Sequence, residues 1–337
     1  MKAIIPAAGI GTRLRPHTYN RPKAMVEVAG KPILSHIIDR VKKIDPEEIV
    51  IIVGYQKNML KKWIKNKYPD LNISFITQKE MLGLGHAIYM AKDHITDDKD
   101  LLIILGDTIV DIDLKNLSNT KYSKIVTKQV NNPKRFGIAE LDTKGFITSL
   151  VEKPDNPATN KALIGVYYLK NGSSLFESLK YIIENDIKTK GEYQITDALN
   201  YMVKKKNEKI KTHDIQNWFD CGTIDTLLKT NKFLLDKKSD KNIDDKKFPK
   251  SIIIPPVEIK ENVEIENSVI GPYVSISDNV SIKNCIIKNS LIYANTELYN
   301  SLLKNSIIGN KNYINNQFKV LNIGSKSYIK ENSNGKK

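Results

Sequence analysis

The carboxy-terminal part of the chain repeats an apolar residue every five or six positions. An α-helix would need a spacing near 3.6 and a half-buried strand a spacing of two, so neither explains this series. Spacings of five and six are typical of hexapeptide-type repeats, in which short strands stack as coils of a parallel β-helix. With three faces per turn, the eleven positions give nearly four coils. They are Ile259, Ile265, Ile270, Ile276, Ile282, Ile287, Ile292, Leu298, Leu303, Ile308 and Ile314.

A second residue follows the same register. Asparagine stands three positions before the repeated apolar residue at 262, 267, 279, 284, 289, 295, 300 and 305. Asparagine adopts the left-handed backbone conformation more readily than other residues with a side chain, apart from glycine. We therefore expect these asparagines to form the corners between the faces of each coil.

The preceding residues follow another pattern and predict an α/β domain over 1–235. Short apolar runs expected to be strands alternate with amphipathic segments expected to be helices, which is typical of a parallel sheet covered on both faces. The expected strands are 3–5, 49–53, 73–77, 101–105, 122–130, 136–142 and 163–169. The expected helices are 32–44, with Pro32 in the first turn, 57–66, 84–95, 173–185, 195–206 and 223–235. Residues 236–250 are highly charged and predict a linker, followed by the β-helix over 251–330 and a tail over 331–337.

Composition narrows the function classes. The chain has 337 residues and a formal net charge of +15, with 40% apolar residues and no apolar run near the ~20 that span a bilayer. The excess lysines are dispersed, so we expect neither nucleic acid nor membrane as a partner. The two cysteines, Cys221 and Cys285, lie outside any metal-ligand spacing and are expected to be reduced thiols. No secretory signal precedes the first strand, and we expect a cytoplasmic protein.

The arginines are more informative than the total charge. The chain has only five, and Arg13, Arg15 and Arg21 fall close together behind a glycine-rich turn, Ala8-Gly9-Ile10-Gly11-Thr12. Such a turn lets backbone N–H groups approach phosphate oxygens, and guanidinium groups bind phosphate through paired donors. A dinucleotide fingerprint would need glycine at position 14, where the chain has leucine, and GxxxxGK[ST] is absent. The turn therefore predicts phosphate binding of another kind.

The run AAGIGTRLRPHTYNRPKAM at 7–25 resembles the amino-terminal signature of the sugar-1-phosphate nucleotidylyltransferases. The similarity continues through GLGHA (83–87), LGD (105–107), VEKP (151–154), GEYQITDAL (191–199) and WFDCGT (218–223). It covers about residues 1–235 and is closest to glucose-1-phosphate thymidylyltransferase-like proteins of the longer type. The resemblance implies a Rossmann-like nucleotidyltransferase domain with a mixed, mainly parallel sheet, followed by a left-handed β-helix.

The resemblance also implies a reaction and a set of residues. A nucleoside triphosphate, dTTP first and UTP next, would react with a hexose 1-phosphate, glucose first, in the presence of Mg²⁺. The catalytic residues would be Arg13, Lys23, Asp107, Lys153 and Asp220, with Asp107 and Asp220 as metal ligands. The nucleotide-binding residues would be Ala8, Gly9, Gly11, Thr12, Gln78 and Gly83, and the sugar-binding residues Gly137, Glu152, Lys153, Gly165 and Tyr167. His86 and Trp218 are expected to have structural roles, and Asp197 is a further sugar-side candidate.

Several alternatives stay open at this stage. Ala24 and Thr108 depart from the bacterial thymidylyltransferase pattern, so uridylyl transfer to glucose 1-phosphate remains an alternative. The short β-helix resembles that of mannose-1-phosphate guanylyltransferases, so guanylyl transfer to mannose 1-phosphate remains a second one. A catalytically silent regulatory subunit of the same fold is a further alternative. The chain has no histidine after His213, so we expect no acetyltransferase on the β-helix. The stacked coils favour a homo-oligomer assembled partly through the β-helix.

Overall fold

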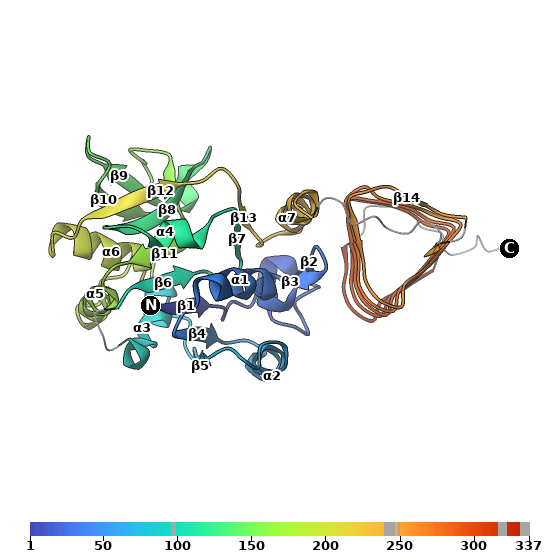
Figure 1. The fold of residues 1–337 in the computed structure, drawn as a ribbon, viewed down its shortest axis with the longest axis horizontal. Helices are drawn as coiled ribbons and strands as arrows, with labels where there is room; N and C mark the ends of the chain where they lie inside the picture. Colours follow the sequence, from blue (N-terminus) through green and yellow to red (C-terminus); the bar gives the residue numbers. More distant parts are fainter. Residues whose placement is uncertain (96–98, 239–246, 249, 316–321, 331–337) are drawn as a thin grey trace. The chain divides into compact units, whose positions relative to one another are not determined.

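The computed structural model describes residues 1–95, 99–238, 247–248, 250–315 and 322–330 (Figure 1). They form two compact units. The first comprises Met1–Gly9 and Leu34–Trp218, and the second comprises Ile10–Ile33 and Phe219–Lys337. Contacts thus group residues 10–33 and the last α-helix with the carboxy-terminal strands, and they divide the glycine-rich turn between Gly9 and Ile10. Most of the predicted linker over 236–250 and the predicted tail over 331–337 lie outside the described residues.

A nine-stranded sheet forms the centre of the first unit. Its main path runs β10-β9-β11-β6-β1-β4-β5, with β8 paired to β11 and β12 paired to β8. The bounds are β1 Lys2–Pro6, β4 Glu48–Val53, β5 Ile73–Thr77, β6 Leu101–Ile104, β8 Ser123–Gln129, β9 Gly137–Leu141, β10 Ile147–Glu152, β11 Lys161–Leu169 and β12 Ile210–Asp214. Each strand predicted from an apolar run is present, and its ends lie within two residues of the predicted ends. β10 and β12 were not predicted, because they contain too many polar residues to form apolar runs.

The sheet is mixed: four adjacent strands at one end form a parallel region, and the other pairs are antiparallel apart from β12, which runs parallel to β8. β6, β1, β4 and β5 run parallel, with Ile4 opposite Val50 and Ile103. β11 runs antiparallel to β6, β8 and β9, and β10 runs antiparallel to β9. The alternation of strands and helices in the sequence predicted a parallel sheet, and it predicted only the parallel region correctly. The antiparallel strands β9, β10 and β11 follow one another without long helices between them, so the alternation gave no information about their direction.

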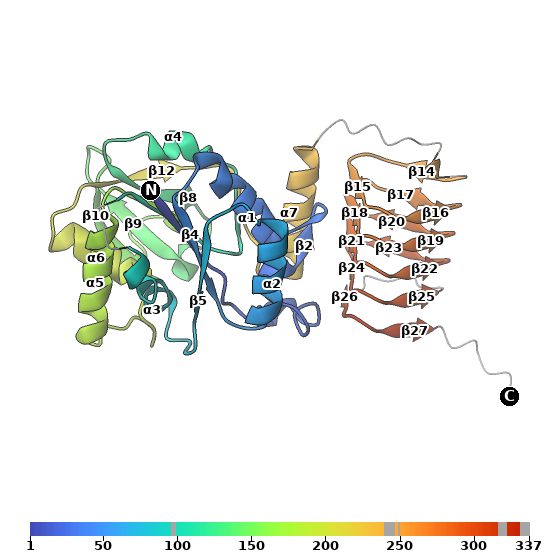
Figure 2. The same cartoon turned by 60° about the horizontal axis from the view of Figure 1, so that its bottom comes forward.

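Helices cover both faces of this sheet. α3, α5 and α6 share one core with the strand residues Ile4, Val50 and Ile103, and α1 and α2 lie on the other side (Figure 2). The bounds are α1 Ile33–Val41, α2 Lys57–Lys67, α3 Leu84–Tyr89, α4 Leu114–Ser118, α5 Gly172–Glu184 and α6 Ile195–Lys204. Short 3-10 helices span Lys42–Ile44, Lys92–His94 and Pro133–Arg135, and the short strands β7 and β13 span Thr108–Val110 and Trp218–Asp220.

Two predicted helices need correction. Pro32 lies in the short strand β3, Lys31–Pro32, and α1 begins one residue later. The helix expected over 84–95 ends at Tyr89, because Ala91 and His94 bond the carbonyls three residues back instead of four. The helical spacing of apolar residues continues past Tyr89, because Ala91 and Ile95 are buried in the same core as the apolar side chains of α3.

The second unit begins with a segment of little regular structure. Residues 10–33 contain two 3-10 helices, Thr12–Leu14 and Lys23–Met25, and the two-residue strands β2, Glu27–Val28, and β3. α7, Ile224–Asp236, follows later in the chain, and Thr223 begins it with a capping box. We call residues 10–33 the signature segment.

The carboxy-terminal strands form a three-sided parallel β-helix, which Figure 1 shows nearly end-on as a triangle and Figure 2 shows as stacked coils. Ile259, Ile276, Ile292 and Ile308 lie in register in successive coils, and ten of the eleven repeated apolar positions form the buried core, with Ile259 packed partly buried against it. This confirms the predicted fold class.

Each face of the β-helix is one parallel sheet. The first sheet contains β14 Ile252–Ile253, β17 Val269–Ile270, β20 Ile286–Lys288 and β23 Leu302–Lys304. The second contains β15 Val257–Ile259, β18 Val274–Ile276, β21 Ser290–Ile292, β24 Ile307–Ile308 and β26 Asn322–Ile323, and the third β16 Glu264–Glu266, β19 Ser281–Lys283, β22 Glu297–Tyr299, β25 Tyr313–Asn315 and β27 Tyr328–Lys330.

The predicted asparagine corners are confirmed. All eight asparagines have positive φ angles, between 44° and 58°. Their side chains also bond one another from coil to coil: Asn267 donates to Asn284 at 2.8 Å, and Asn284 donates to Asn300 at 2.9 Å. Each asparagine thus provides both the backbone conformation of the corner and a side-chain hydrogen bond with a neighbouring coil.

The three faces of the β-helix differ in what covers them. On the second sheet the outward side chains of Ser275, Leu291 and Ile307 are buried, and Ser275 bonds Asn231 of α7 at 2.7 Å. The third sheet is polar, with an ion pair between Lys283 and Glu266. Among the described residues no helix is long and apolar enough to cross a membrane.

Candidate functional site

Several predicted residues meet at one edge of the first unit. Ala8 and Gly9 follow β1, Gln78 follows β5 and Asp107 follows β6. These strands run parallel and lie beside one another, so their carboxyl ends open onto the same edge. In open α/β sheets ligands bind beyond this edge.

Two glycines allow the loops at this edge to pack against the turn after β1. A side chain at Gly54 would lie 2.7 Å from the carbonyl oxygen of Ala8, and one at Gly106 would lie 2.7 Å from that of Pro6. The Gly106 N–H also donates to the Pro6 carbonyl at 2.9 Å. The loop that carries Asp107 is therefore fixed directly on the end of β1.

Gln78 and Gly83 border the same region and contact different elements. Gln78 is 8% exposed, and its backbone N–H donates to Val53 at the end of β4. Gly83 has a φ of 107°, and a side chain there would lie 2.6 Å from the Tyr193 carbonyl. The N–H of Tyr193 in turn donates to Leu82 at 2.9 Å. The structure thus joins two motifs far apart in the sequence, GLGHA and GEYQITDAL.

The predicted sugar-binding residues form a connected cluster. Thr196, at the start of α6, donates a 2.6 Å hydrogen bond to Oε2 of Glu152 at the end of β10. A side chain at Gly137 would lie 2.9 Å from that same oxygen, so only glycine leaves the backbone open here. Lys153 follows with a φ of 43°, its Nζ 3.5 Å from Glu152 Oε1 and its side chain 42% exposed. Strained backbone of this kind occurs preferentially at functional sites.

Two more groups lie close enough to Glu152 to respond to its charge. Tyr167 is buried, and burial together with the Glu152 carboxylate raises the pKa of its hydroxyl. Burial first, and then Glu152, also raises the pKa of Asp197, a shift that a hydrogen bond from Thr189 opposes. Asp197 Oδ2 is buried without a hydrogen-bond partner among the described residues. The cluster therefore concentrates acceptors suited to sugar hydroxyl groups.

Gly165, also predicted to bind sugar, contacts a different neighbour. Its φ is 82°, and a side chain would lie 2.5 Å from a methyl group of Leu105. Its carbonyl accepts a 3.0 Å hydrogen bond from the Leu105 N–H. These contacts support the loop that carries Asp107.

In the second unit, Arg13 and Asp220 both border Gly222. A side chain at Gly222 would lie 2.8 Å from Nη2 of Arg13 and 3.6 Å from Oδ1 of Asp220. Because residue 222 is glycine, there is room for the guanidinium group of Arg13 beside it. Thr12 and Arg13 are exposed on the first 3-10 helix of the signature segment.

Lys23 is held close to the glycine-rich turn. It is 9% exposed, and a side chain at Gly11 would lie 2.9 Å from its Cβ. Gly11 has a φ of 73°, and its carbonyl accepts a 2.8 Å hydrogen bond from Thr18. Lys23 and the turn at Gly11 are therefore packed directly against each other.

His86 and Trp218 contact neighbouring aromatic rings, which fits the structural roles expected for them. His86 lies beside Tyr193 with ring centroids 6.4 Å apart, and Trp218 meets Phe136 edge-on at 5.4 Å. The two cysteines, Cys221 and Cys285, are buried and have free thiol groups.

The two acidic residues predicted to bind metal belong to different units, Asp107 to the first and Asp220 to the second. In the described part of the chain no group of three or more His, Cys, Asp or Glu side chains could hold a metal ion. Mg²⁺ commonly binds proteins through only one or two carboxylates and takes its remaining ligands from phosphate and water. Each of these aspartates is therefore a ligand of the kind that Mg²⁺ takes.

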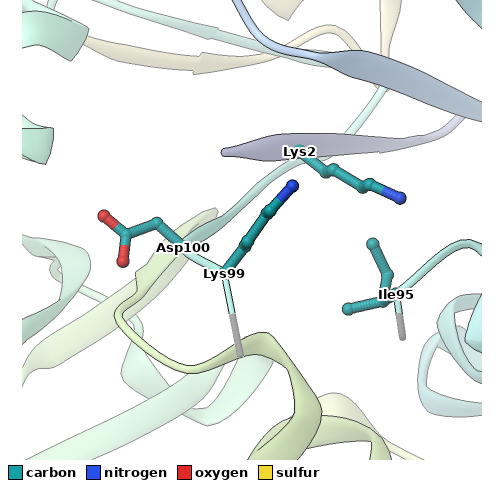
Figure 3. Close-up of a pocket in the computed structure, with 4 residues that line it drawn as sticks. All are labelled: Lys2, Ile95, Lys99 and Asp100. Atoms are coloured by element: carbon teal, nitrogen blue, oxygen red, sulfur yellow. The ribbon is translucent and has the colours of Figure 1, made fainter. Parts of the chain in front are cut away.

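A small pocket elsewhere in the first unit has paired charges. Lys2, Ile95, Lys99 and Asp100 line it, as Figure 3 shows. Lys2 begins β1, so the pocket lies at the opposite end of the strand from Ala8. Lys99 pairs with Glu47 at 2.7 Å, and Asp100 pairs with Lys170 at 3.2 Å. These ion pairs explain its charged lining without a ligand.

Two residues that border the site were not recognised from the sequence. Thr196 lies within GEYQITDAL, where Asp197 drew attention as the charged residue, although it is the threonine that bonds Glu152. Gly222 lies within WFDCGT, and its role depends on the approach of Arg13 from a distant part of the sequence.

Comparison with known proteins agrees with this arrangement. Residues 2–237 match the family described as nucleotidyl transferase, and residues 253–333 match the GMPPB C-terminal domain. The chain is 40% identical over 238 residues to the bifunctional protein GlmU of Methanocaldococcus jannaschii, a match that covers 70% of this chain and 55% of that protein. It is 32% identical to the UTP–glucose-1-phosphate uridylyltransferase AglF of Haloferax volcanii, covering 66% of this chain and 91% of AglF.

Solved structures show the same similarity. The crystal structure of a UDP-glucose pyrophosphorylase complexed with UDP-glucose matches with a TM-score of 0.59 and 26% identity, over 70% of this chain and 98% of that one. A putative glucose-1-phosphate thymidylyltransferase from Bacillus anthracis gives the same score and identity, over 69% and 94% of the two chains. The chain spans a little over half the length of the GlmU proteins that it matches. The family match over residues 2–237 identifies the chain as a member of the nucleotidyl transferase family.

Proposed function

We propose that this protein transfers a nucleotidyl group from a pyrimidine nucleoside triphosphate, dTTP or UTP, to a hexose 1-phosphate, with glucose 1-phosphate as the first candidate. The products are an NDP-sugar and pyrophosphate. The observation that supports this most is the sugar-side cluster, in which Thr196 fixes Glu152 beside Gly137 and the amine of Lys153 remains partly exposed.

The proposed reaction needs no general base, because the attacking oxygen of the sugar phosphate is already anionic. That oxygen forms a bond to the α-phosphorus of the nucleotide as the bond to the bridging oxygen breaks, and pyrophosphate leaves with the bonding electrons. Catalysis then consists of aligning two polyanions and neutralising charge. Arg13 and Lys23 would neutralise the triphosphate and the departing pyrophosphate, and Lys153 would hold the sugar phosphate.

The sugar and the base would be recognised by groups at the edge of the sheet. Glu152 would accept hydrogen bonds from sugar hydroxyls near the open backbone of Gly137, with Tyr167 beneath them. Gln78 and Gly83 would contact the base, and the turn Ala8–Gly9 with Gly11 and Thr12 would approach the phosphates.

We further propose that Asp107 and Asp220 hold Mg²⁺ when both substrates are present. The ion would supply positive charge to the phosphate oxygens. The two aspartates would also fix where the triphosphate can bind.

Three of the similar proteins bear on the identity of the nucleotide base. AglF is named a uridylyltransferase and one structural neighbour was crystallised with UDP-glucose, which favours UTP. The thymidylyltransferase from Bacillus anthracis favours dTTP. Ala24 and Thr108, which depart from the thymidylyltransferase pattern, are both buried.

The decisive experiment measures pyrophosphate release from dTTP, UTP, GTP and ATP, each with glucose, galactose, mannose and N-acetylglucosamine 1-phosphates. We expect the highest kcat/KM for a pyrimidine nucleotide with glucose 1-phosphate and no release in EDTA. Asp107→Asn and Asp220→Asn should each abolish the reaction, whereas Asp93→Asn, on an exposed 3-10 helix, should retain it. Full activity in either of the first two variants would contradict the metal assignment.

The same matrix tests the competing functions. The match of residues 253–333 to the GMPPB C-terminal domain makes GTP with mannose 1-phosphate the second pair to examine. Turnover of that pair alone would replace the pyrimidine assignment. No release with any pair would favour the silent regulatory subunit. Acetyl-CoA with an amino-sugar phosphate should give no product, since no histidine lies on the β-helix.

We also propose that the protein assembles as a homo-oligomer, partly through the first sheet of the β-helix. Ile252 and Ile286 are 62% and 52% exposed, and they lie in register with Val269 and Leu302 along that face. Light scattering should show an oligomer at micromolar concentration, and Ile286→Lys should weaken it more than Lys283→Ala on the polar face. A monomer at that concentration would refute the assembly.

A further inference from the structure

The signature segment has little regular secondary structure of its own, and most of its internal backbone hydrogen bonds close single turns, such as those from Leu14 to Gly11 and from Met25 to Pro22. Its two 3-10 helices each span three residues, and its only strand pairing is the two-residue contact of β2 with β3. Within the segment, Thr18 and Lys23 fasten the turn at Gly11. Side chains from other parts of the second unit also hold it.

The side chain of Tyr293, just after β21 of the β-helix, lies against this segment. It is 3% exposed, and its hydroxyl donates a 3.0 Å hydrogen bond to the backbone carbonyl of Glu27. The Arg21 guanidinium lies 5.5 Å from its ring centroid, within range of a cation–π interaction, and His17 meets the ring edge-on at 5.9 Å. Tyr293 thus contacts the segment on both sides of Lys23 in the sequence.

Other β-helix residues extend this contact. Ser277 donates a 2.8 Å hydrogen bond to the carboxylate of Glu27. His17 bonds the Asn322 side chain of β26, and a side chain at Gly324 would lie 2.7 Å from Cβ of Pro16. Two successive coils and part of a third therefore hold the stretch 16–27.

The hairpin turn that follows is fastened separately. Ala29 has a φ of 47°, and its N–H donates to Asn231 of α7 at 2.9 Å. The same asparagine accepts from Ser275 and donates to the carbonyl of Tyr273 at 3.2 Å, both in the β-helix. Lys238 bonds the Ala29 carbonyl and the Glu258 carboxylate. Together these contacts fix both ends of the stretch that carries Lys23.

We propose that the β-helix, through Tyr293, positions the signature segment for triphosphate binding. This goes beyond the structural and assembly roles of such a domain and rests on the proposed function, because it assigns the triphosphate to Arg13 and Lys23. Tyr293 is a positioning residue, since it acts through the Glu27 backbone and the Arg21 side chain. The sugar-side cluster belongs to the other compact unit.

The test compares Tyr293→Phe with Tyr299→Phe in the full chain. Tyr299 also carries a hydroxyl that is bonded at 3.0 Å, but to Glu297 on the polar face of the β-helix. Loss of the buried bond to Glu27 should raise the KM for the nucleotide about tenfold and leave the KM for the sugar 1-phosphate unchanged. Tyr299→Phe should change neither. Tyr293→Ala, which also removes the ring from Arg21 and His17, should raise the nucleotide KM further.

Hydrogen exchange gives a second measurement that does not depend on catalysis. Backbone amides of residues 11–27 should exchange faster in Tyr293→Phe than in Tyr299→Phe, while those of the β-helix core, such as Ile282 and Ile287, should keep their protection. Equal exchange in 11–27 would overturn the proposal, as would an equal rise in both KM values, which would indicate general destabilisation. If no nucleotide reacts at all, the proposed function fails, and the exchange comparison still decides whether Tyr293 orders the segment.

Discussion

Thr196 donates a 2.6 Å hydrogen bond to Glu152, and this bond joins the start of α6 to the end of β10. The two residues are 44 positions apart in the sequence. The bond fixes one carboxylate oxygen beside Gly137 and leaves the other within 3.5 Å of the Lys153 amine. The orientation of the proposed sugar-binding carboxylate therefore depends on a neutral hydroxyl group.

Replacing this hydroxyl should weaken binding of the sugar and not of the nucleotide. In Thr196→Val the isosteric side chain fills the same space, but Glu152 loses a donor whose bond to a charged group contributes about 1.5–3 kcal/mol. We expect the KM for the sugar 1-phosphate to rise by roughly tenfold or more. Steady-state kinetics with each substrate varied in turn check this. Thr148→Val, at an exposed position of β10, is the matched control.

The contact between Gly222 and Arg13 predicts a loss of activity with little loss of stability. In Gly222→Ala the new methyl group would meet Nη2 of Arg13 at 2.8 Å, and the flexible guanidinium can move away. Displacing it by about 1 Å should lower kcat/KM on the order of 100-fold. The free energy of unfolding should change by less than about 1 kcal/mol.

A double-mutant cycle separates this effect from general damage. Because Gly222→Ala acts by moving Arg13, adding it to Arg13→Ala should produce little further loss. Additive losses in the double variant would show that Gly222 acts independently of Arg13.

The asparagine ladder predicts how much a β-helix corner contributes to stability. Asn284 has a φ of 53°, accepts a hydrogen bond from Asn267 and donates one to Asn300. Asn284→Ala should destabilise the β-helix by about 2 kcal/mol, because alanine tolerates this conformation poorly and both bonds are lost. Asn284→Gly should recover about 1 kcal/mol of that, since glycine adopts the conformation freely. Thermal melting of the three proteins measures the order, and a glycine variant no more stable than the alanine variant would contradict it.

His17 predicts a dependence of stability on pH. Burial, and to a smaller extent the charge of Arg21, lowers its pKa from 6.5 to about 4, although the bond to Asn322 opposes the shift. Because the folded-state pKa lies below the unfolded value, the fold favours the neutral ring. This contribution is complete above pH 6.5 and is lost as the pH falls toward 4, and it amounts to about 3 kcal/mol.

The measurement is urea denaturation at pH 7.5 and pH 4.5 of the wild type and of His17→Gln, whose amide does not titrate. Carboxylates contribute to both proteins, so the difference between their pH dependences isolates the histidine. The wild type should lose more stability than the variant on acidification, and parallel losses would show that His17 does not carry this effect.

The sequence alone determined the features that repeat or that lie close together along the chain. The spacing of apolar residues from Ile259 to Ile314 predicted the β-helix, because each coil is a local structure that the next one copies. The asparagines at its corners followed from the same register and from the conformational freedom of that residue. The parallel strands β1, β4 and β6 were likewise visible as apolar runs, since nearly all of their side chains are buried.

Only the tertiary structure decided which distant residues meet. β10 and β12 alternate polar and apolar side chains weakly, so their place in the sheet depends on their neighbours. The bond from Thr196 to Glu152 and the approach of Arg13 to Gly222 join positions 44 and 209 residues apart, and no local pattern encodes such a contact. The contacts of Tyr293 with the signature segment likewise join residues far apart in the sequence, and only the packing of these parts of the chain brings them together.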